Sequence, residues 1–429
     1  MSTTRRNFLV SSSATIAGAT LFRTASASSV PRDERELRVA LIGCGGRGTG
    51  AAAQALSTAG AVKLVAMADA FQDRLDGCLA ELTKDFAARL DVPPARRFVG
   101  FDAYEKAIDA GVDVVILTTP PGFRPTHFAH AVARGKHVFM EKPVAVDGPG
   151  VRTVLAAAAE AKQRNLKVGV GLQRRHDARY VETIRRLQDG AIGEINFARA
   201  YWNSSGVWMN KRQPGMTEMQ YQMRNWYYFN WLCGDHIVEQ HIHNLDVINW
   251  LKGACPVRAQ GQGGRQVRVG PDYGEIYDHH VVEFTYSDGT KLLSQSRHQP
   301  GCWENVSEHA HGALGECDIS SASIKPRKGD AWRSRAEGGD PFQVEHDDLF
   351  AAIREDRPYC EAEYGATSTL TAILGRMATY SGKIVSWEEA LNSRLVLAPD
   401  SLAWDAAPKS RPDAAGLYAI PTPGSALAF

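Results

Sequence analysis

Residues 37–48, LRVALIGCGGRG, decide the fold of this chain. A short apolar, β-rich run ends in a G-x-G-x-x-G sequence, and the alanine-rich sequence that continues to Leu56 predicts a helix. A second apolar run, residues 62–68, predicts a strand that ends at Asp69, 21 residues after the third glycine. Strand, glycine-rich turn, helix, strand and acid in this order predict a dinucleotide-binding βαβ unit.

Each glycine of this motif has a distinct expected role. Gly43 permits the tight turn, Gly45 lets the backbone approach a pyrophosphate, and Gly48 allows close packing of the helix. The start of the helix offers unpaired N–H groups and a partial positive charge to that anion. Asp69 is expected to accept both hydroxyls of an adenosine ribose, which favours NAD, while Arg74 keeps NADP open.

The alternation of strands and helices continues to about residue 172. Apolar runs at 112–117, 136–140 and 167–172 predict strands, and the segments 102–110, 125–134 and 151–164 predict helices. Repeated βα units of this kind form a parallel, doubly wound sheet, which binds ligands beyond the carboxyl ends of its strands. The residues expected at that cofactor site are Gly43, Gly45, Arg47, Gly48, Asp69, Thr119, Pro120, Glu141, Lys142 and Gln173.

The composition excludes several classes of protein. The chain has 429 residues, which suggests two or three domains, and its formal net charge of +1 gives no field to hold a nucleic acid or a membrane surface. Its seven cysteines include no C-x-x-C, which argues against a disulfide framework and a zinc finger. No apolar run reaches the ~18 residues that a stable membrane anchor needs.

The first residues of the chain are typical of an export signal. TRRNFL at 4–9 precedes a weakly apolar stretch at 9–21, and ASA at 25–27 offers small residues for cleavage. The paired arginines predict a twin-arginine signal peptide over 1–27, followed by a polar linker over 28–36. An amphipathic anchor is the alternative, but the stretch lacks a polar face. We therefore expect the twin-arginine export machinery as a partner and a periplasmic, exported protein that can carry its cofactor with it.

Further motifs extend the pattern beyond the glycine-rich turn. TTPP at 118–121, EKP at 141–143, LQRR at 172–175 and the segment around His243 follow in order. With the strand, GCGGRG and the acid, they resemble the Gfo/Idh/MocA family, named for glucose–fructose oxidoreductase, inositol dehydrogenase and a rhizopine catabolism protein. The resemblance implies an NAD(P)-dependent oxidoreductase whose N-terminal α/β Rossmann domain precedes an α+β domain with an open, mostly antiparallel sheet.

The second half of the sequence agrees with that expectation. Strands are predicted at 194–202, 257–266, 279–286 and 291–296, with a hairpin turn at 287–290, and helices at 345–355 and 368–381. We expect a Rossmann domain over 37–173, a substrate-binding and oligomerisation domain over 174–405, and a surface arm over 406–429. The open sheet of relatives implies a homo-oligomer, by analogy alone.

Residues 234–250, GDHIVEQHIHNLDVINW, predict one helix that carries ionisable groups. At about 100° per residue, Asp235, His236, Glu239, His243 and Asp246 fall within one sector of roughly 100° beside an apolar strip. Ionisable groups in such a place are expected where a core meets a cleft.

The family pattern is an acid, three residues, a histidine, two residues and an aspartate. Glu239, His243 and Asp246 fit it, with Glu where Asp is usual. The resemblance implies that His243 takes the proton of a substrate hydroxyl, that Lys142 binds the same oxygen, and that Glu239 binds substrate or tunes the pair. The structural alternatives are a hydrogen-bonded core histidine, an acid at a helix N-terminus, and a solvated lysine.

The substrate and metal predictions are less specific. Arg175, Asp235, His236 and Trp303 are candidate substrate residues, and the aromatic run at 225–229 could stack on sugars or form core or a subunit interface. Nine of thirteen histidines lie between 236 and 346, so a metal site is conceivable. The resemblance implies none, because the ordinary members of the family use no metal.

Three functions remain open from the sequence. An exported enzyme has no soluble NAD pool to exchange with, so it must hold its nucleotide and restore its redox state in each cycle. One hypothesis is an oxidoreductase for a secondary hydroxyl of a carbohydrate or polyol, recycled by a second carbonyl compound. The second is a redox-neutral glycosidase or lyase that oxidises, eliminates, adds water and reduces. The third is a nucleotide-binding scaffold without catalysis.

Overall fold

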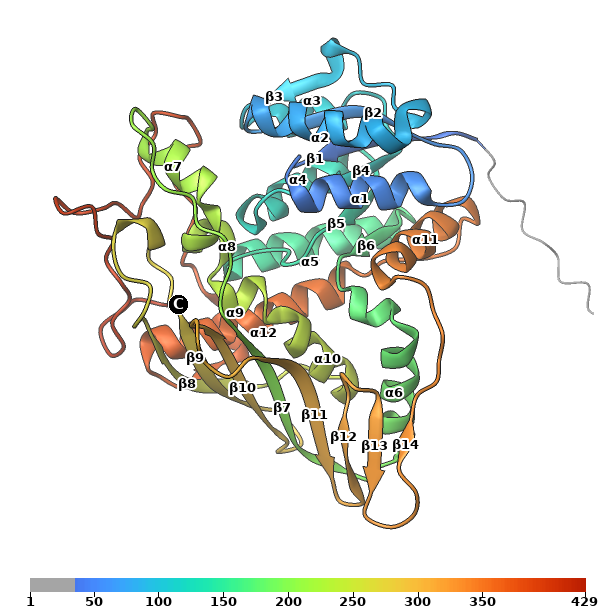
Figure 1. Cartoon of the computed structure of the whole chain (residues 1–429), viewed down its shortest axis with the longest axis vertical. Coiled ribbons are helices and arrows are strands. Elements are labelled where there is room, and N and C mark those ends of the chain that lie inside the picture. Colours follow the sequence, from blue (N-terminus) through green and yellow to red (C-terminus); the bar gives the residue numbers. More distant parts are fainter. Residues whose placement is uncertain (1–34) are drawn as a thin grey trace, which may run out of the picture.

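The computed structural model describes residues 35–429, so the predicted signal peptide and most of the linker lie outside the described residues. Two sheets organise the chain (Figure 1). The first has the order β3-β2-β1-β4-β5-β6, and all its pairs are parallel. This is the predicted doubly wound topology. Its strands are β1 (Leu37–Ile42), β2 (Val62–Asp69), β3 (Arg97–Val99), β4 (Val114–Leu117), β5 (His137–Met140) and β6 (Val168–Val170).

Both faces of the first sheet are covered, because its strands are apolar on both sides. In β1, Leu37, Val39 and Leu41 face one core, and Ala40 and Ile42 face the other. The first core is closed by α1 (Gly46–Ser57), α2 (Gln72–Phe86) and α11 (Pro341–Arg354). The second is closed by α3 (Ala103–Ile108), α4 (Arg124–Ala133) and α5 (Gly148–Gln163).

The second sheet has nine strands in the order β14-β13-β12-β11-β7-β10-β9-β8-β15. Only β7 and β10 pair in parallel, which confirms the predicted open, mostly antiparallel sheet. The strands are β7 (Ile195–Ser204), β8 (Arg258–Gly264), β9 (His279–Thr285), β10 (Lys291–His298), β11 (Asn305–Gly312), β12 (Gly315–Asp318), β13 (Ser323–Pro326), β14 (Trp332–Arg333) and β15 (Val385–Ser386).

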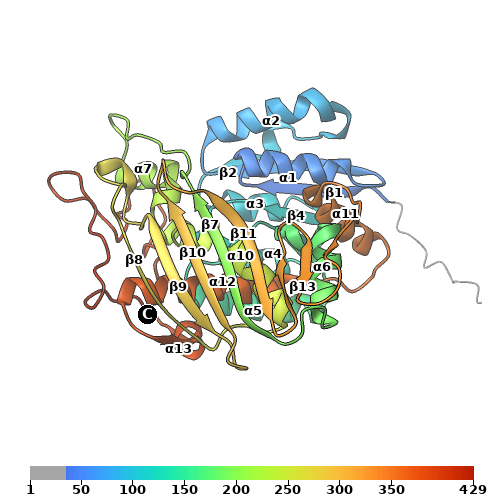
Figure 2. The ribbon, with the colours of Figure 1, turned by 60° about the horizontal axis from the view of Figure 1, so that its bottom comes forward.

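Helices cover one face of this sheet and leave the other open. Figure 2 looks onto the open face, with the helices behind the strands. Its central helix, α12 (Ala362–Ser381), also packs against α5 and so joins the two sheets. The other helices on or beside this sheet are α6 (Ala178–Gln188), α7 (Glu218–Arg224), α8 (Asn230–Cys233), α9 (His236–Glu239), α10 (Ile242–Lys252) and α13 (Trp387–Asn392).

Helix α11 returns to the first sheet, although it follows the second sheet in the chain. Its Leu349, Phe350 and Ile353 are buried in the core that contains Phe139 of β5. The sequence analysis places this helix with the second domain. The structure differs because an apolar helix face packs wherever it buries most area, regardless of chain order.

The predicted single helix over 234–250 is wrong. The structure has two helices, α9 and α10, separated at Gln240 and His241, and Asp235 precedes α9 with φ 75°. A sector computed from an unbroken helix therefore does not describe this segment. The physical reason is that the side chains of this segment bind partners on different strands, as described below.

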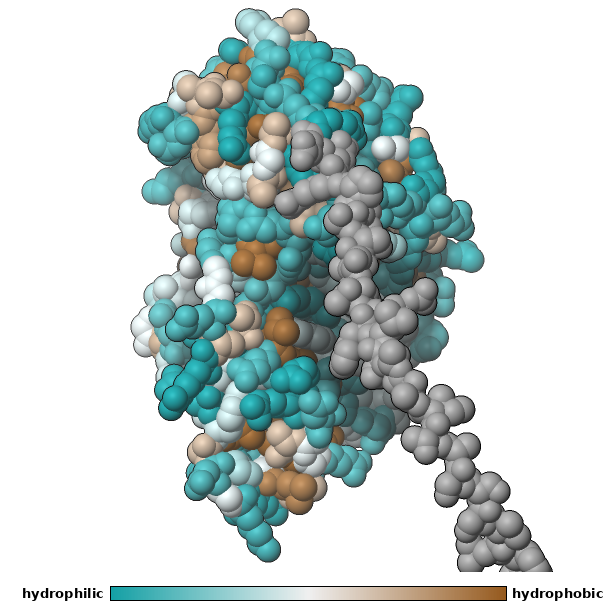
Figure 3. Space-filling view, turned by 90° about the vertical axis from the view of Figure 1, so that its right-hand side faces the viewer, coloured by the Kyte–Doolittle hydropathy of each residue, from teal (hydrophilic) through white to brown (hydrophobic). Residues whose placement is uncertain are grey.

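The described helices and the surface in one view bear on membrane contact. Among the described helices, none combines the length and apolarity needed to cross a bilayer. On the side of the molecule seen in Figure 3, hydrophilic residues predominate and hydrophobic residues are scattered. Single exposed apolar residues of this kind are normal for a folded domain.

Within the predicted C-terminal arm, Tyr418 is buried edge-on against Phe229, with ring centroids 5.0 Å apart.

Candidate active site

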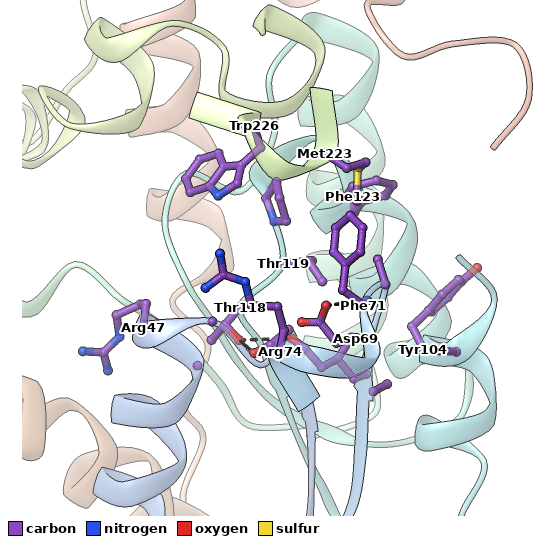
Figure 4. Close-up of a pocket in the computed structure, with 18 of the residues that line it drawn as sticks. Arg47, Asp69, Phe71, Arg74, Tyr104, Thr118, Thr119, Phe123, Met223 and Trp226 are labelled. Atoms are coloured by element: carbon purple, nitrogen blue, oxygen red, sulfur yellow. Dashed lines mark hydrogen bonds between the residues drawn. The ribbon is translucent and has the colours of Figure 1, made fainter. Parts of the chain in front are cut away.

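A pocket of about 450 Å³ lies beyond the carboxyl ends of β1, β2 and β4. Figure 4 shows Asp69, Arg74, Thr118 and Thr119 on its Rossmann side, with Met223 and Trp226 opposite. Parallel sheets bind ligands at this edge because strand ends and helix starts converge there. The pocket therefore contains the predicted Gly43, Gly45, Arg47, Gly48, Asp69, Thr119 and Pro120.

The glycine-rich turn has the geometry that a dinucleotide requires. Gly43 has φ 97°, and a Cβ there would lie 2.6 Å from the Thr118 backbone. A Cβ on Gly48 would lie 1.9 Å from the Gly43 carbonyl oxygen, whereas one on Gly45 would meet nothing within 4 Å. The turn is thus tightly packed against the protein at Gly43 and Gly48, and it is open to the pocket at Gly45. Because the first turn of α1 carries no acidic residue, its N–H groups can receive a pyrophosphate.

Backbone N–H groups hold the Asp69 carboxylate at the pocket. Its Oδ2 accepts from the Cys44 N–H at 2.6 Å, and its Oδ1 accepts from the Phe71 N–H at 2.9 Å. Burial raises the pKa of Asp69, and these two hydrogen bonds oppose that rise. Arg74 lines the same pocket, so both the NAD and the NADP determinants of the sequence analysis lie at one place.

Three predicted cofactor residues, Glu141, Lys142 and Gln173, lie outside the pocket lining. Glu141 pairs with Arg47, whose Nε lies 2.8 Å from Glu141 Oε1. Gln173 begins the 3-10 turn Gln173–His176 after β6, and its Oε1 is buried without a hydrogen-bond partner in the described chain. The contact of these three residues with a cofactor stays a prediction.

A buried ion pair joins the segment after β5 to the end of α9. Lys142 Nζ, after β5, donates to the Glu239 carbonyl oxygen at 2.5 Å and to Glu239 Oε1 at 2.9 Å. The two side chains are 11% and 10% exposed. Burial raises the pKa of Glu239, and the charge and hydrogen bond of Lys142 counteract it. Two of the three ammonium donors thus have protein partners, and one is left for a substrate oxygen.

His243 of α10 lies beside this pair in a state suited to accept a proton. Its ring stacks on Trp202 of β7, with centroids 6.0 Å apart and an interplanar angle of 24°. Burial holds the pKa of His243 well below its usual value, and the charges of Lys142 and Arg174 lower it further. The imidazole is therefore neutral at neutral pH, as a general base must be.

Arg175 is committed to a structural ion pair. Its Nε and Nη2 donate to Asp246 Oδ2 and Oδ1 at 2.9 and 2.8 Å, and its guanidinium lies over Tyr364, 3.9 Å from the ring centroid. Ser368 also donates to Asp246, at 2.7 Å. Arg175 and Asp246 tie the 3-10 turn after β6 to α10, and the substrate role of Arg175 stays a prediction.

Asp235 and His236 do not reach the cleft. Both are fully buried, so no substrate can touch them in this structure. The Asp235 carboxylate accepts from the Tyr277 N–H and the Tyr380 hydroxyl, while His236 lies against Ser296 of β10. Their prediction as substrate residues is corrected, because it assumed an unbroken helix with one common face.

Trp303 lies on the other side of the second sheet. It follows β10, is 60% exposed, and meets the Tyr201 ring edge-on at 5.6 Å. Side chains alternate along β7, so Tyr201 and Trp202 face opposite sides, and Trp202 contacts His243. Trp303 therefore lies on the face of the sheet opposite His243, and its contact with substrate stays a prediction.

The sequence analysis missed most of the pocket side opposite Asp69. Trp208, Met223, Arg224 and Trp226 line it, and Arg224 donates to Asp73 of α2 at 2.6 Å. No motif marks these residues. Of the aromatic run at 225–229, Trp226 reaches the pocket, while the other aromatic rings are buried in a core. For Trp202, the alternation along β7 was a usable signal, since Ala198 and Ala200 share its face.

Known proteins match the Rossmann domain by sequence profile and most of the chain by fold. Residues 37–171 match the sequence profile of an oxidoreductase family with an NAD-binding Rossmann fold. An inositol 2-dehydrogenase of Rhizobium meliloti is 25% identical over 318 residues, 73% of this chain and 86% of that enzyme. The 2,7-anhydro-N-acetylneuraminate hydratase of Escherichia coli is 28% identical over 182 residues, 42% of this chain and 44% of that enzyme.

Solved structures show the same fold over most of the chain. Levoglucosan dehydrogenase in complex with NADH and levoglucosan superposes with a TM-score of 0.65 at 17% identity, covering 82% of this chain and 99% of that one. Fold, glycine-rich turn and profile together define an NAD-binding oxidoreductase with a Rossmann domain and a nine-stranded sheet domain. Residues 37–171 match the Gfo/Idh/MocA family, which the motifs of the sequence analysis also resemble.

Proposed function

We propose that this chain oxidises a secondary hydroxyl of a carbohydrate or polyol, with an NAD that stays bound and is recycled in each cycle. The observation that carries the proposal is the buried His243 beside the Lys142–Glu239 ion pair, in which Lys142 directly follows Glu141, the partner of the pocket residue Arg47. The names of the relatives, an inositol dehydrogenase and a levoglucosan dehydrogenase, support a substrate with several hydroxyl groups.

The residues divide the chemistry among them. Bound NAD supplies the acceptor for a hydride from the carbon that bears the hydroxyl. The free donor of Lys142 binds the substrate oxygen and stabilises negative charge on it as its proton leaves. His243 takes that proton, so the alcohol becomes a carbonyl and the imidazole becomes an imidazolium. Glu239 keeps Lys142 in place through two hydrogen bonds.

Trp202 helps to hold the imidazole of His243, the proposed base, in one orientation. Its ring lies nearly parallel to that of His243, which limits rotation of the imidazole. An aromatic face next to the ring also offers no competing donor or acceptor. The proton transfer is thereby confined to the side of His243 that faces the substrate.

Export gives the proposal its second part. The twin-arginine signal expected over 1–27 delivers folded proteins to a compartment without a free NAD pool. A bound nucleotide would have to be re-oxidised on the protein by a second carbonyl compound. This part is supported by the sequence of the first residues, which lie outside the described structure.

The nucleotide content of the purified protein tests both parts. We expect denaturation to release NAD, identified by mass, from protein that received no added nucleotide. Addition of polyols and aldoses should reduce it, and a carbonyl acceptor should re-oxidise it. Release of NADP instead would overturn the role given to Asp69. Protein that neither carries nor binds a nicotinamide coenzyme would disprove the proposal.

A redox-neutral glycosidase or lyase is the second candidate. The similarity to a hydratase of an anhydro sugar supports it, since hydration is one half of that cycle. Incubation with aryl glycosides separates the two functions. Release of the phenol without net NADH and without a second acceptor favours the glycosidase, and accumulation of reduced nucleotide favours the oxidoreductase.

The third hypothesis, a nucleotide-binding scaffold, predicts a different response to substitution. A scaffold would tolerate Lys142→Ala and His243→Ala but lose its function with Gly45→Trp, which fills the open side of the turn. An oxidoreductase would lose its function with all three. The phenotype of a strain that carries each substitution decides between them.

A further inference from the structure

Three histidines and an aspartate gather in the interior of the second domain. Asp235 and His236 lie at the start of α9, His280 is in β9 and His298 ends β10. The first three side chains are fully buried, and His298 is 2% exposed. None of the four lines the cofactor pocket. A buried carboxylate among imidazoles needs either complete hydrogen bonding or a cation.

The hydrogen bonding is incomplete for the imidazoles, although Asp235 Oδ1 accepts from the His236 N–H at 2.5 Å. Asp235 Oδ1 lies 3.3 Å from His280 Nε2 and 3.8 Å from His236 Nε2. Both Nε2 atoms are buried without a hydrogen-bond partner in the described chain. The three atoms lie within 4.8 Å of one another. They therefore form a set of possible ligand atoms directed at one point.

The proton positions around His280 sharpen this conclusion. The Thr379 hydroxyl donates to the Arg376 carbonyl at 3.0 Å, so its oxygen accepts from His280 Nδ1 at 2.9 Å. With its proton on Nδ1, a neutral His280 has its lone pair on Nε2. That lone pair faces the carboxylate oxygen of Asp235 at 3.3 Å. Two lone pairs at this distance repel unless a cation lies between them.

The opposite side of each group is held by the protein. Asp235 Oδ2 accepts from the Tyr277 N–H at 2.9 Å and from the Tyr380 hydroxyl at 2.5 Å. His236 Nδ1 lies 2.7 Å from Ser296 Oγ. Metal-binding histidines and carboxylates are commonly oriented by hydrogen bonds of this kind on their far atoms. The three groups are thus positioned before any ion binds.

The spacing agrees with a small divalent ion. Zinc binds imidazole nitrogen and carboxylate oxygen at about 2.0–2.2 Å, which places tetrahedral ligand atoms about 3.3 Å apart. The separations here of 3.3 and 3.8 Å need only a small adjustment to reach that geometry. Two imidazoles and a carboxylate suit zinc and its neighbours better than magnesium or calcium.

We propose that Asp235, His236 and His280 bind one divalent transition-metal ion of the zinc type. The ion joins the start of α9 to β9. At the end of the same short helix, Glu239 holds Lys142, so the ion fixes the frame of the ion pair without touching the reacting atoms. This site departs from the metal-free expectation that the family resemblance gave.

The rival occupant is a proton. An imidazolium at His280 could pair with Asp235 and remove the clash of lone pairs, but it leaves His236 Nε2 without a partner. His298 provides the control, because its Nδ1 accepts from Arg268 at 2.7 Å. A neutral His298 then carries its proton on Nε2 and cannot bind a metal there.

Metal analysis of the untagged protein, purified without chelators, tests the proposal. We expect close to one zinc per chain by mass spectrometry. Asp235→Asn and His280→Gln should lower the content at least tenfold, and His298→Gln should keep it. Circular dichroism and NAD content show whether each variant is folded. Equal metal in His280→Gln and the unaltered protein would overturn the proposal.

A measurement on the unaltered chain covers the case of unfolded variants. Protein stripped with a chelator and titrated with Co²⁺ should develop the visible absorption of four-coordinate cobalt and a higher melting temperature. If the purified protein carries no metal and Co²⁺ gives neither signal, the proton is the occupant and the proposal is wrong. The NAD content of the same samples reports on the cofactor site separately.

Discussion

Two parts of the proposed active site, named here the cofactor wall and the substrate wall, are built by different means. The cofactor wall, residues 43–48 with Asp69, works mainly through its backbone, and even the carboxylate of Asp69 is oriented by two backbone N–H groups. The substrate wall, Lys142 with Glu239 and His243, works through side chains that are buried and ionisable. A backbone site needs only its own turn to form, whereas a side-chain site needs partners from distant segments.

This difference also predicts how substitutions affect each wall. The glycines of the turn carry no side-chain charge, so an added methyl group disturbs the turn through steric overlap. In the substrate wall, removal of one partner leaves another buried charge without compensation. Substitutions should therefore change cofactor affinity on one side, and rate and stability on the other.

The largest expected effect is on the base of the substrate wall. His243→Asn should lower kcat/KM by ~10²–10⁴ because it removes the general base. Its bound NAD should remain, since His243 is not in the cofactor wall. His309→Asn, on the open face of the sheet beside Tyr201, is the control and should retain activity. Steady-state kinetics and nucleotide content measure both, and loss of NAD from His243→Asn would contradict the separation of the walls.

The Lys142–Glu239 pair should show coupled stability. Lys142→Met leaves the Glu239 carboxylate buried and unpaired, which should cost about 3–5 kcal/mol in the free energy of unfolding. Adding Glu239→Gln should restore part of that loss because the uncompensated charge is gone. Urea denaturation of both single variants and the double variant measures the coupling. Strictly additive effects would show that the pair does not behave as a buried unit.

The cofactor wall should respond to a single methyl group. Gly48→Ala places a Cβ 1.9 Å from the Gly43 carbonyl oxygen, so NAD affinity should fall by about 10–100-fold. Gly50→Ala in the same helix is the matched control, because its Cβ would meet only the Arg47 side chain at 3.5 Å. It should bind NAD normally and gain ~0.5–1 kcal/mol in stability. Calorimetric titration of the stripped proteins compares them.

The smallest expected effect is on the pH dependence of stability, and it comes from His176 in the 3-10 turn after β6. Burial alone would lower the pKa of His176, but hydrogen bonds with Asp348 and Glu361 raise it to about 9. Because this value lies above that of the unfolded chain, the stabilisation is complete below about pH 6.5 and is lost as the pH rises through 9. The contribution is at most about 3 kcal/mol. Unfolding of His176→Gln should lack this pH dependence between pH 6.5 and 9, and an unchanged pH profile would contradict it.

The Rossmann half was predictable because its signals are local. The apolar run of β1 and the glycines after it specify strand, turn and helix within a dozen residues, and the predicted strand ends agree with the structure to within a few residues. Asp69 could be assigned from its distance along the chain, since parallel strands end at the same edge.

The segment around α9 was not predictable in the same way. The turn at Asp235, with φ 75°, is held by Tyr277 and Tyr380, which lie 42 and 145 residues away in the sequence. We expected Arg175 to contact the substrate. Only the packing of α10 shows that Arg175 forms an ion pair with Asp246. Periodicity reports the shape of an unbroken helix and carries no information about such distant partners.

By itself, the sequence determined the α/β class, the cofactor turn and the identity of Lys142 and His243 as candidates, because local spacing encodes backbone geometry and family pattern. The tertiary structure alone decided that Asp235 and His236 are buried, that Arg175 pairs with Asp246, and that Trp202 contacts His243 while Trp226 lines the pocket. Which face of a strand or helix borders the cleft depends on how the two sheets pack, and that packing is the sum of many weak contacts between residues far apart in the chain.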